Sequence, residues 1–332
     1  MRLGIDFTGG ESPASLYFDA AWQACRKLAP TCSLRIFASP SVAMQFSAII
    51  KEKEPSLTSL ISFHTVAETI AMSDHPLGAI RRKKNSSLVV AMRMLKKKQL
   101  DAFISCGNTG ALVASAALSL PMLPGIKRPA LLARLPTMRD PVAVLDVGGN
   151  VSCKAENLRQ FAFLGAAYQA ALFSVSQPRV GLLNIGSESK KGTEEVRQAY
   201  ELLKADPHAR RAMHFVGNVE GRDIFKGVVD VLVTDGFTGN VLLKTAEGVA
   251  SFIFEKLELT LKAATAFKEV CSELNYNEHP GAAICGVEGT VIKVHGSAAP
   301  KTFYNSILAA AESLQKEQIP RLKAKLQEFL SS

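Results

Sequence analysis

A run of four cations is the cluster in this chain whose residue types are best suited to bind an anion: Arg81, Arg82, Lys83 and Lys84. Ser86 and Ser87 follow the run, and either could cap a helix extending toward Leu100. The free N–H groups and the dipole at a helix N-terminus attract anions, and nearby cations strengthen that attraction. The alternative is a solvated charge run. We predict a phosphate-binding site formed by Arg81, Arg82, Lys83, Lys84, Ser86 and Ser87.

The second feature that could do chemistry is a set of five loops, each of which follows a predicted strand and contains glycine beside small polar residues. The loops begin near Asp6, Gly107, Asp146, Asn184 and Asp235. Ligands of parallel sheets bind beyond the carboxyl ends of the strands, where glycine lets backbone N–H groups approach closely. One such loop would be ordinary turn chemistry, whereas five at one sheet edge predict a cleft. Its predicted lining is Asp6, Gly9, Gly10, Gly107, Thr109, Gly110, Asp146, Asn150, Asn184, Lys190 and Thr238.

Four residues of this cleft are expected to be catalytic: Asn108, Asp235, Asn240 and His295. Asn240 could instead cap a long helix, and His295 could be structural. Cys106 invites a thioester mechanism, but no histidine is near it in sequence, and a lone cysteine after a strand is usually just buried. The cleft lacks a Ser-His-Asp set or a metal triad. It suits phosphate as ligand or nucleophile, because phosphate needs positioning more than activation.

Composition describes a globular chain of 332 residues, with 47% hydrophobic and 21% charged residues. The six cysteines form no C-x-x-C pair and the histidines show no H-E-x-x-H spacing, so we expect reduced thiols, no metal and no cofactor. The net charge of +9 reflects either solubility or an acidic partner. Nucleic acid is disfavoured, because no nucleic-acid-binding motif is present.

The N-terminus has no apolar run typical of a signal peptide, since Asp6 interrupts it. The longest weakly charged stretch, 102–126, contains Gly107, Gly110, Pro121 and Pro124, which excludes an uninterrupted spanning helix there. We expect a soluble, cytoplasmic protein that could still lie at the inner face of a membrane.

Short apolar runs alternate with helical patterns, which predicts an α/β fold around a parallel sheet. The predicted strands are Leu3–Ile5, Leu34–Ala38, Ala102–Ser105, Val142–Val147, Val180–Ile185, Met213–Val216, Val228–Thr234 and Thr290–Val294. The predicted helices are Ala14–Leu28, Ser87–Leu100, Gly110–Leu120, Glu156–Ser174, Thr193–Ala205 and Asn240–Leu274. We expect a single catalytic unit over 1–332, with a change of lobe near the proline-rich segment 121–141. That segment also fits a loop or a channel wall.

Six blocks in order along the chain resemble the bacterial phosphate acyltransferases, the PlsX family. They are Arg81–Ser87, the G-N-T-G-A-L run at Asn108, Pro178–Gly186, Gly217–Glu220, Asp235–Asn240 and His295–Ser297. The resemblance spans Asp6 to about residue 311. It implies a Rossmann-like α/β/α fold, similar to phosphotransacetylases and to isocitrate and isopropylmalate dehydrogenases. It also implies a homodimer that transfers an acyl group from acyl carrier protein to inorganic phosphate, for phospholipid synthesis.

The resemblance further implies that a membrane glycerol-3-phosphate acyltransferase consumes the acyl-phosphate. Three departures from the family pattern stand out. The final Asp of D-A-M-G-G-D is Glu11, the Ala of S-A-G-N-T-G is Cys106, and the stretch 252–280 is shorter than the family's helical hairpin. Because that hairpin is linked to dimer and membrane contacts, the segment 240–275 is our candidate for either role.

The mechanistic hypothesis is direct transfer, with amides of Gly107–Gly110 or Gly239–Asn240 stabilising the oxyanion. Two alternatives differ in class. A nicotinamide-dependent decarboxylating dehydrogenase would need clustered acids for a metal, and no such cluster is visible in the sequence. A non-catalytic scaffold that binds the carrier protein or a membrane surface would not need the polar sheet edge.

Overall fold

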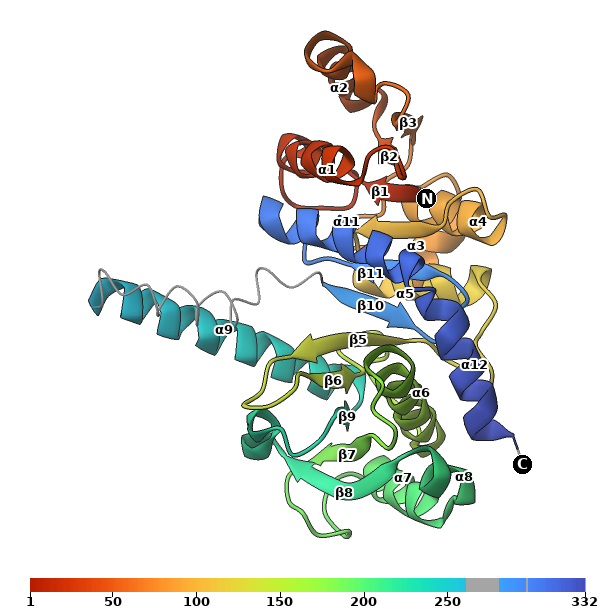
Figure 1. Ribbon diagram of the computed structural model, residues 1–332, viewed down its shortest axis with the longest axis vertical. Helices are drawn as coiled ribbons and strands as arrows, with labels where there is room; N and C mark the ends of the chain where they lie inside the picture. Colours follow the sequence, from red (N-terminus) through yellow and green to blue (C-terminus); the bar gives the residue numbers. More distant parts are fainter. Residues whose placement is uncertain (261–280, 297, 332) are drawn as a thin grey trace. The chain divides into compact units, whose positions relative to one another are not determined.

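The computed structural model describes residues 1–260, 281–296 and 298–331, and it forms two compact α/β units (Figure 1). The first unit consists of Met1–Met122 and His279–Ile319, and the second of Leu123–Glu278 and Pro320–Ser332. The chain therefore first passes between units at Met122, at the start of the segment 121–141. Each unit contributes its own set of strands, and each set has polar loops at the carboxyl ends of its strands.

Six strands of the first unit lie side by side among its described residues, and five of them are parallel. Their order is β3 (Ile61–Thr65), β2 (Ser33–Ala38), β1 (Arg2–Asp6), β4 (Ala102–Ser105), β11 (Thr290–Lys293) and β10 (Ala282–Cys285). Only β10 is antiparallel to its neighbour, β11. Strands covered on both faces read as continuous apolar runs, and β4 is buried along its whole length. The carboxyl ends of β1, β4 and β11 consequently meet at one edge.

Two groups of helices cover this sheet. Helices α1 (Ala14–Leu28) and α11 (Pro300–Gln315) pack against each other, and α3 (Pro76–Arg82), α4 (Ser87–Lys96) and α5 (Thr109–Ser119) form the other group. Both α11 and α4 contact β1 and β4. Under α1 and α11 the core is aromatic, with the Tyr17 and Phe303 rings 4.7 Å apart. Helix α2 (Pro40–Lys53) and the short helix Pro55–Leu57 connect β2 to β3.

The described strands of the second unit lie side by side in the order β5 (Ala130–Leu135), β6 (Val142–Leu145), β9 (Val231–Val233), β7 (Arg179–Asn184) and β8 (His214–Glu220). Strand β5 is antiparallel to β6 and the other pairs are parallel. Helix α6 (Ala155–Phe173) packs on β6, β9 and β7. The remaining elements are α7 (Glu194–Ala205), α8 (Pro207–Ala212), the short helix Gly221–Lys226, α9 (Gly236–Thr260) and α12 (Gln318–Leu330).

The structure corrects several predicted elements. Strand β5 lies inside the segment 121–141 that we interpreted as a loop or a channel wall. Helix α9 begins at Gly236, so Asn240 does not cap it, and the predicted continuation over 261–274 lies outside the described residues. Helix α4 ends at Lys96 rather than Leu100. Strands β3 and β10 and helices α2, α3, α8, α11 and α12 were not predicted.

None of the helices within the described residues is both long and apolar enough to cross a membrane. Helix α9 does expose large apolar side chains, among them Phe237, Val241, Val249, Phe252 and Ile253. It is described only as far as Thr260, so part of the segment 240–275 lies beyond the structure's coverage. A role of this segment in a dimer or at a membrane stays a prediction.

Candidate active site

A continuous set of hydrogen bonds joins three segments at the polar edge of the first unit. The Asp6 carboxylate, fully buried, accepts hydrogen bonds from Thr8 N (2.9 Å), Thr8 Oγ1 (2.8 Å) and Ser105 Oγ (2.7 Å). Thr8 Oγ1 is also hydrogen bonded to Ser87 Oγ at 2.9 Å, and Gly107 N donates to Ser105 Oγ at 2.9 Å. We name this set the Asp6 network. It links the loop after β1, the N-terminus of α4 and the loop after β4.

The two glycine loops of the Asp6 network lie against each other. A Cβ atom at Gly9 would lie 2.6 Å from the Cα of Gly107 and 2.8 Å from Asp6 Oδ2. No real side chain tolerates such contacts, so only glycine allows this approach. At the neighbouring position, a Cβ on Gly10 would collide with the Tyr17 ring. The loops predicted to line the cleft are therefore held together by close packing as well as hydrogen bonds.

Asn108 holds this edge together from the N-terminus of α5. Its Oδ1 accepts a hydrogen bond from Ala111 N (3.0 Å), which caps the helix. Its Nδ2 lies within hydrogen-bond distance of the carbonyl oxygens of Ala71, Met72 and Asp74, at 3.0–3.3 Å. These bonds give the Asn108 side chain a positioning role, and its catalytic role stays a prediction. Thr109 and Gly110, also predicted to line the cleft, form the first residues of α5.

The four predicted phosphate-binding cations lie between two helices, at the C-terminus of α3 and just before the N-terminus of α4. Arg81 and Arg82 form the last turn of α3, where cations interact favourably with the dipole of that helix. Lys83 donates to Asp74 Oδ2 (2.6 Å) and to the Thr69 carbonyl (2.7 Å). Lys84 is exposed, like both arginines, and these three side chains form no hydrogen bond or ion pair with another described residue.

Ser86 occupies the N-cap position of α4, and its hydroxyl donates to the Lys83 carbonyl instead of capping the helix. Ser87 is buried and joins the Asp6 network through Thr8. The α4 N-terminus, which we predicted to bind phosphate, therefore lies directly beside the glycine loops after β1 and β4.

Cys106 and His295 flank this edge in different surroundings. Burial raises the pKa of the Cys106 thiol to about 12, and the Asp6 carboxylate contributes in the same direction against an opposing effect of Lys293. At neutral pH the thiol is not a nucleophile. His295 follows β11, and its ring is exposed. It is thus placed at the predicted sheet edge with access to solvent.

In the second unit, Asp146 organises the loop after β6. Its buried carboxylate accepts hydrogen bonds from Leu131 N, Gly148 N and Gly149 N at Oδ1, and from Asn150 N and Asn150 Nδ2 at Oδ2, at 2.6–3.1 Å. Burial raises the pKa of Asp146, while these donors act in the opposite direction. With five N–H donors already bonded to it, this carboxylate fixes the backbone of the loop and does not bind a ligand.

The first turn of α9 packs on that same loop. Asp235 caps the helix, because its carboxylate accepts from Thr238 N (2.8 Å) and Thr238 Oγ1 (2.9 Å). Gly236 N donates to the Asn150 carbonyl at 2.7 Å, and a Cβ at Gly239 would collide with the Asp146 carbonyl oxygen. Asn240 is exposed on the next turn.

Asn184 and Lys190 belong to a separate loop of the second unit. Asn184 Nδ2 donates to the Lys191 carbonyl (3.0 Å), which closes the loop after β7, and Lys190 is exposed. From β8, Asn218 Nδ2 donates to the Glu188 carbonyl at 2.8 Å. No hydrogen bond between described residues joins this loop to the Asp146 loop. These two residues are therefore not brought together with the others by direct contacts.

Three residues at the edge of the first unit were missed from the sequence: Thr8, Ser105 and Lys293. Thr8 and Ser105 adjoin predicted site residues, so their types were a usable signal. Lys293, 8% exposed, ends the buried strand β11. A lysine closing an apolar strand run was its only signal.

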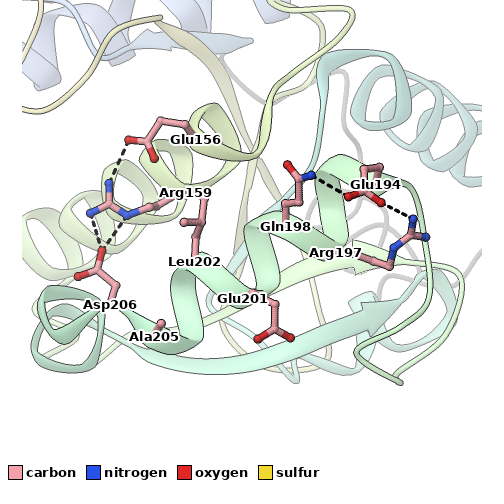
Figure 2. A pocket seen from close by; sticks show the side chains of 9 residues that line it. All are labelled: Glu156, Arg159, Glu194, Arg197, Gln198, Glu201, Leu202, Ala205 and Asp206. Carbon is pink, nitrogen blue, oxygen red and sulfur yellow. Dashed lines mark hydrogen bonds and ion pairs between the residues drawn. The ribbon is translucent and has the colours of Figure 1, made fainter.

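A charged groove of about 920 Å³ lies on the second unit, between α6 and α7 (Figure 2). Its cations are already neutralised: Arg159 pairs with Glu156 and Asp206, and Arg197 pairs with Glu194. The groove includes none of the predicted site residues. Across the described part of the chain, no three His, Cys, Asp or Glu side chains are grouped so that they could hold a metal ion.

The fold is that of phosphotransacetylases. The chain superimposes on a phosphotransacetylase from Streptococcus pyogenes with a TM-score of 0.62 at 14% identity, covering 95% of this chain and 94% of that one. A branched-chain phosphotransacylase from Enterococcus faecalis gives a TM-score of 0.58 at 14% identity, covering 96% and 99%. The predicted fold class is confirmed.

The sequence comparisons define the family. Residues 1–321 match the family model described as fatty acid synthesis protein. The chain is 42% identical over 333 residues to the phosphate acyltransferase of Dictyoglomus thermophilum, covering 97% of this chain and 96% of that one. It is 39% identical over 329 residues to the phosphate acyltransferase of Chlamydia caviae, covering 98% and 99%. The chain belongs to this family of fatty acid synthesis proteins and is an acyltransferase, which confirms the resemblance drawn from its sequence.

Proposed function

We propose that the protein transfers a fatty acyl group from acyl carrier protein to inorganic phosphate. The observation that carries this proposal is the Asp6 network, because it joins two glycine loops and a helix N-terminus into one amide-rich sheet edge. Such an edge offers fixed N–H donors and needs no reorganisation when charge develops. The names of the curated relatives, phosphate acyltransferase, support the same reaction class.

Phosphate is proposed to bind where the α4 N-terminus meets the exposed cations Arg81, Arg82 and Lys84. Their side chains form no ion pair with other described residues, which leaves their charge available to an anion. Lys83 contributes indirectly, since its bond to Asp74 holds the segment that Asn108 also contacts. The helix dipole and free N–H groups add to the attraction.

The chemical step is proposed to be direct. A phosphate oxygen attacks the thioester carbonyl carbon, the C–O bond forms, the C–S bond breaks, and the proton of hydrogen phosphate passes to the leaving thiolate. Amides of Gly107–Gly110 are proposed to stabilise the oxyanion, with those of Gly239–Asn240 as the second candidate. Cys106 takes no part, because its thiol is buried and its pKa is raised to about 12. In the first unit, the exposed His295 is proposed to contact substrate and Asn108 to act by positioning. In the second candidate, the exposed Asn240 is proposed to contact substrate and Asp235 to act by positioning.

The carrier protein is proposed to dock on the α4 basic surface, defined as Arg81, Arg82, Lys84, Arg93, Lys96, Lys97 and Lys98. All seven side chains are exposed. A positive surface of this kind attracts an acidic protein and speeds their encounter, most strongly at low salt. The homodimer, the cytoplasmic location and the hand-over of acyl-phosphate to a membrane glycerol-3-phosphate acyltransferase remain proposals from the family resemblance.

The test is phosphate-dependent release of carrier thiol from palmitoyl-acyl carrier protein, with Arg82→Ala beside Lys97→Ala. Both variants remove one exposed cation of the α4 basic surface, but only Arg82 adjoins the proposed phosphate site. We expect Arg82→Ala to raise the KM for phosphate by about tenfold, the size of one charge-assisted hydrogen bond, and Lys97→Ala to leave it unchanged. Equal phosphate KM values in both variants would contradict a phosphate site beside Arg82. No thiol release by the wild type, at any acyl-chain length, would overturn the reaction itself.

A further inference from the structure

Lys293 lies at the polar edge of the first unit, and the proposed reaction does not yet use it. It is 8% exposed at the end of β11, and it pairs in register with Ser105 on β4. Ser105 in turn pairs in register with Asp6 on β1. Residues at the same register position of neighbouring strands project from the same face of a sheet. Asp6, Ser105 and Lys293 therefore form one row, in which a carboxylate and an ammonium flank a hydroxyl.

The ammonium group of Lys293 joins two loops. Its Nζ donates to the carbonyl oxygen of Cys106 (3.4 Å) and to that of Val294. The first carbonyl leads into the glycine loop at Gly107, and the second leads into His295 and Gly296. The Gly296 carbonyl accepts from Tyr17 Oη (3.0 Å) and Glu11 N (3.0 Å), which ties this second loop to the loop after β1.

A buried lysine is not needed for packing at this position. Methionine has a similar length and would fill the same space without the cost of removing an ammonium from water. A buried charge that bonds backbone carbonyls orients them, and it does so most strongly where water is excluded. Both charges lie at the start of the glycine loop: Lys293 Nζ is 3.4 Å from the Cys106 carbonyl oxygen, and Asp6 Oδ2 is 2.7 Å from Ser105 Oγ.

We propose that Lys293 is a positioning residue of the acyl transfer: its buried ammonium holds the Gly107–Gly110 loop and the His295 loop in the arrangement that stabilises the reacting thioester. The proposal deepens the proposed function and rests on it. Because the ammonium acts through loop backbone, its loss affects turnover more than phosphate binding at the α4 N-terminus.

The first experiment is chemical rescue. Lys293→Ala removes the side-chain atoms that n-propylammonium supplies, and n-propanol supplies a similar shape without the charge. We expect Lys293→Ala to lower kcat by about tenfold or more at little cost in phosphate KM, with recovery in n-propylammonium only. Lys51→Ala, at an exposed lysine of α2 in the same unit and outside the proposed binding surfaces, serves as the control and should respond to neither additive. Equal recovery by n-propanol, or no loss of kcat, would overturn the proposal.

The second experiment does not depend on turnover. Amide hydrogen exchange of Lys293→Met should quicken in 106–110 and 294–296, and stay unchanged in 142–150 of the second unit. Unchanged exchange in both loops would overturn the proposal even if the variant were inactive. If the wild type shows no phosphate-dependent turnover but the exchange result holds, the proposed function fails while the positioning of the two loops by Lys293 stands.

Discussion

Replacing Asp146 by asparagine gives the largest stability effect that the structure lets us work out. The carboxylate accepts three backbone N–H groups at Oδ1, and two N–H groups of Asn150 at Oδ2. An asparagine must place its NH₂ group at one of these two positions. In either orientation the new amide faces donors that previously faced an acceptor, and the residue is fully buried.

The smaller loss follows when the NH₂ group takes the Oδ2 position, where two hydrogen bonds disappear. Hydrogen bonds to charged groups contribute about 1.5–3 kcal/mol each, so Asp146→Asn should cost about 3–6 kcal/mol of unfolding free energy. That is a large part of the roughly 5–15 kcal/mol that stabilises a typical protein. The loop 148–150 and the first turn of α9 that packs on it should loosen as well.

Urea denaturation of wild type, Asp146→Asn and Asp140→Asn measures this cost. Asp140 is an exposed carboxylate of the same unit, so its variant controls for the loss of one charge and should lie within about 0.5 kcal/mol of wild type. A cost below about 1 kcal/mol for Asp146→Asn, with an unchanged m-value, would refute the reasoning that five donors depend on this carboxylate.

Three further predictions concern single side chains. Cys106→Ala should retain kcat within about threefold, because a thiol with a pKa of about 12 is no nucleophile; loss of all turnover would contradict this. Asn108→Ala should lower the unfolding free energy, measured by urea denaturation, by about 1–2 kcal/mol, because the α5 cap is lost. An unchanged urea midpoint would contradict a stabilising role of this cap. Burial acts to raise the pKa of Asp206, but hydrogen bonds from Arg159 outweigh it and hold that pKa below its usual value. The Arg159–Asp206 ion pair therefore stabilises the fold above about pH 4, and this stabilisation is lost on acidification. The stability difference between wild type and Arg159→Met should therefore shrink below that pH, and a difference constant from pH 7 to pH 3 would argue against it.

Local pattern was enough to place the elements that carry the first unit's site. The predicted helix Ala14–Leu28 and strand Ala102–Ser105 coincide with α1 and β4. The helix shows apolar residues at helical spacing and lies between prolines, and the strand is a short apolar run that ends just before Gly107. Strand β5 was missed because its apolar run lies among prolines, which read as loop punctuation. Helix α3 was missed because its seven residues begin at Pro76 and end in the cation run.

The sequence predicted which residue types lie in the loops of the site, but it predicted less well what each residue does there. Glycines beside small polar residues marked the loops at Asp6 and Gly107, since such composition follows from local backbone needs. Their partners could not be read locally: the bond from Ser105 to Asp6 spans 99 positions and depends on strand register. For the same reason the sequence placed Asp146 and Asn108 in the cleft, although their side chains form hydrogen bonds with backbone groups.

The central claim, direct attack by phosphate without an acyl-enzyme, is tested best by a single-turnover experiment. Wild-type protein is mixed with an equal amount of palmitoyl-acyl carrier protein in phosphate-free buffer, and carrier thiol and protein mass are followed before and after phosphate is added. The account predicts no thiol and no change in protein mass until phosphate arrives, then one thiol and one acyl-phosphate per carrier protein consumed. One equivalent of thiol released without phosphate, together with a protein heavier by a palmitoyl group, would contradict it.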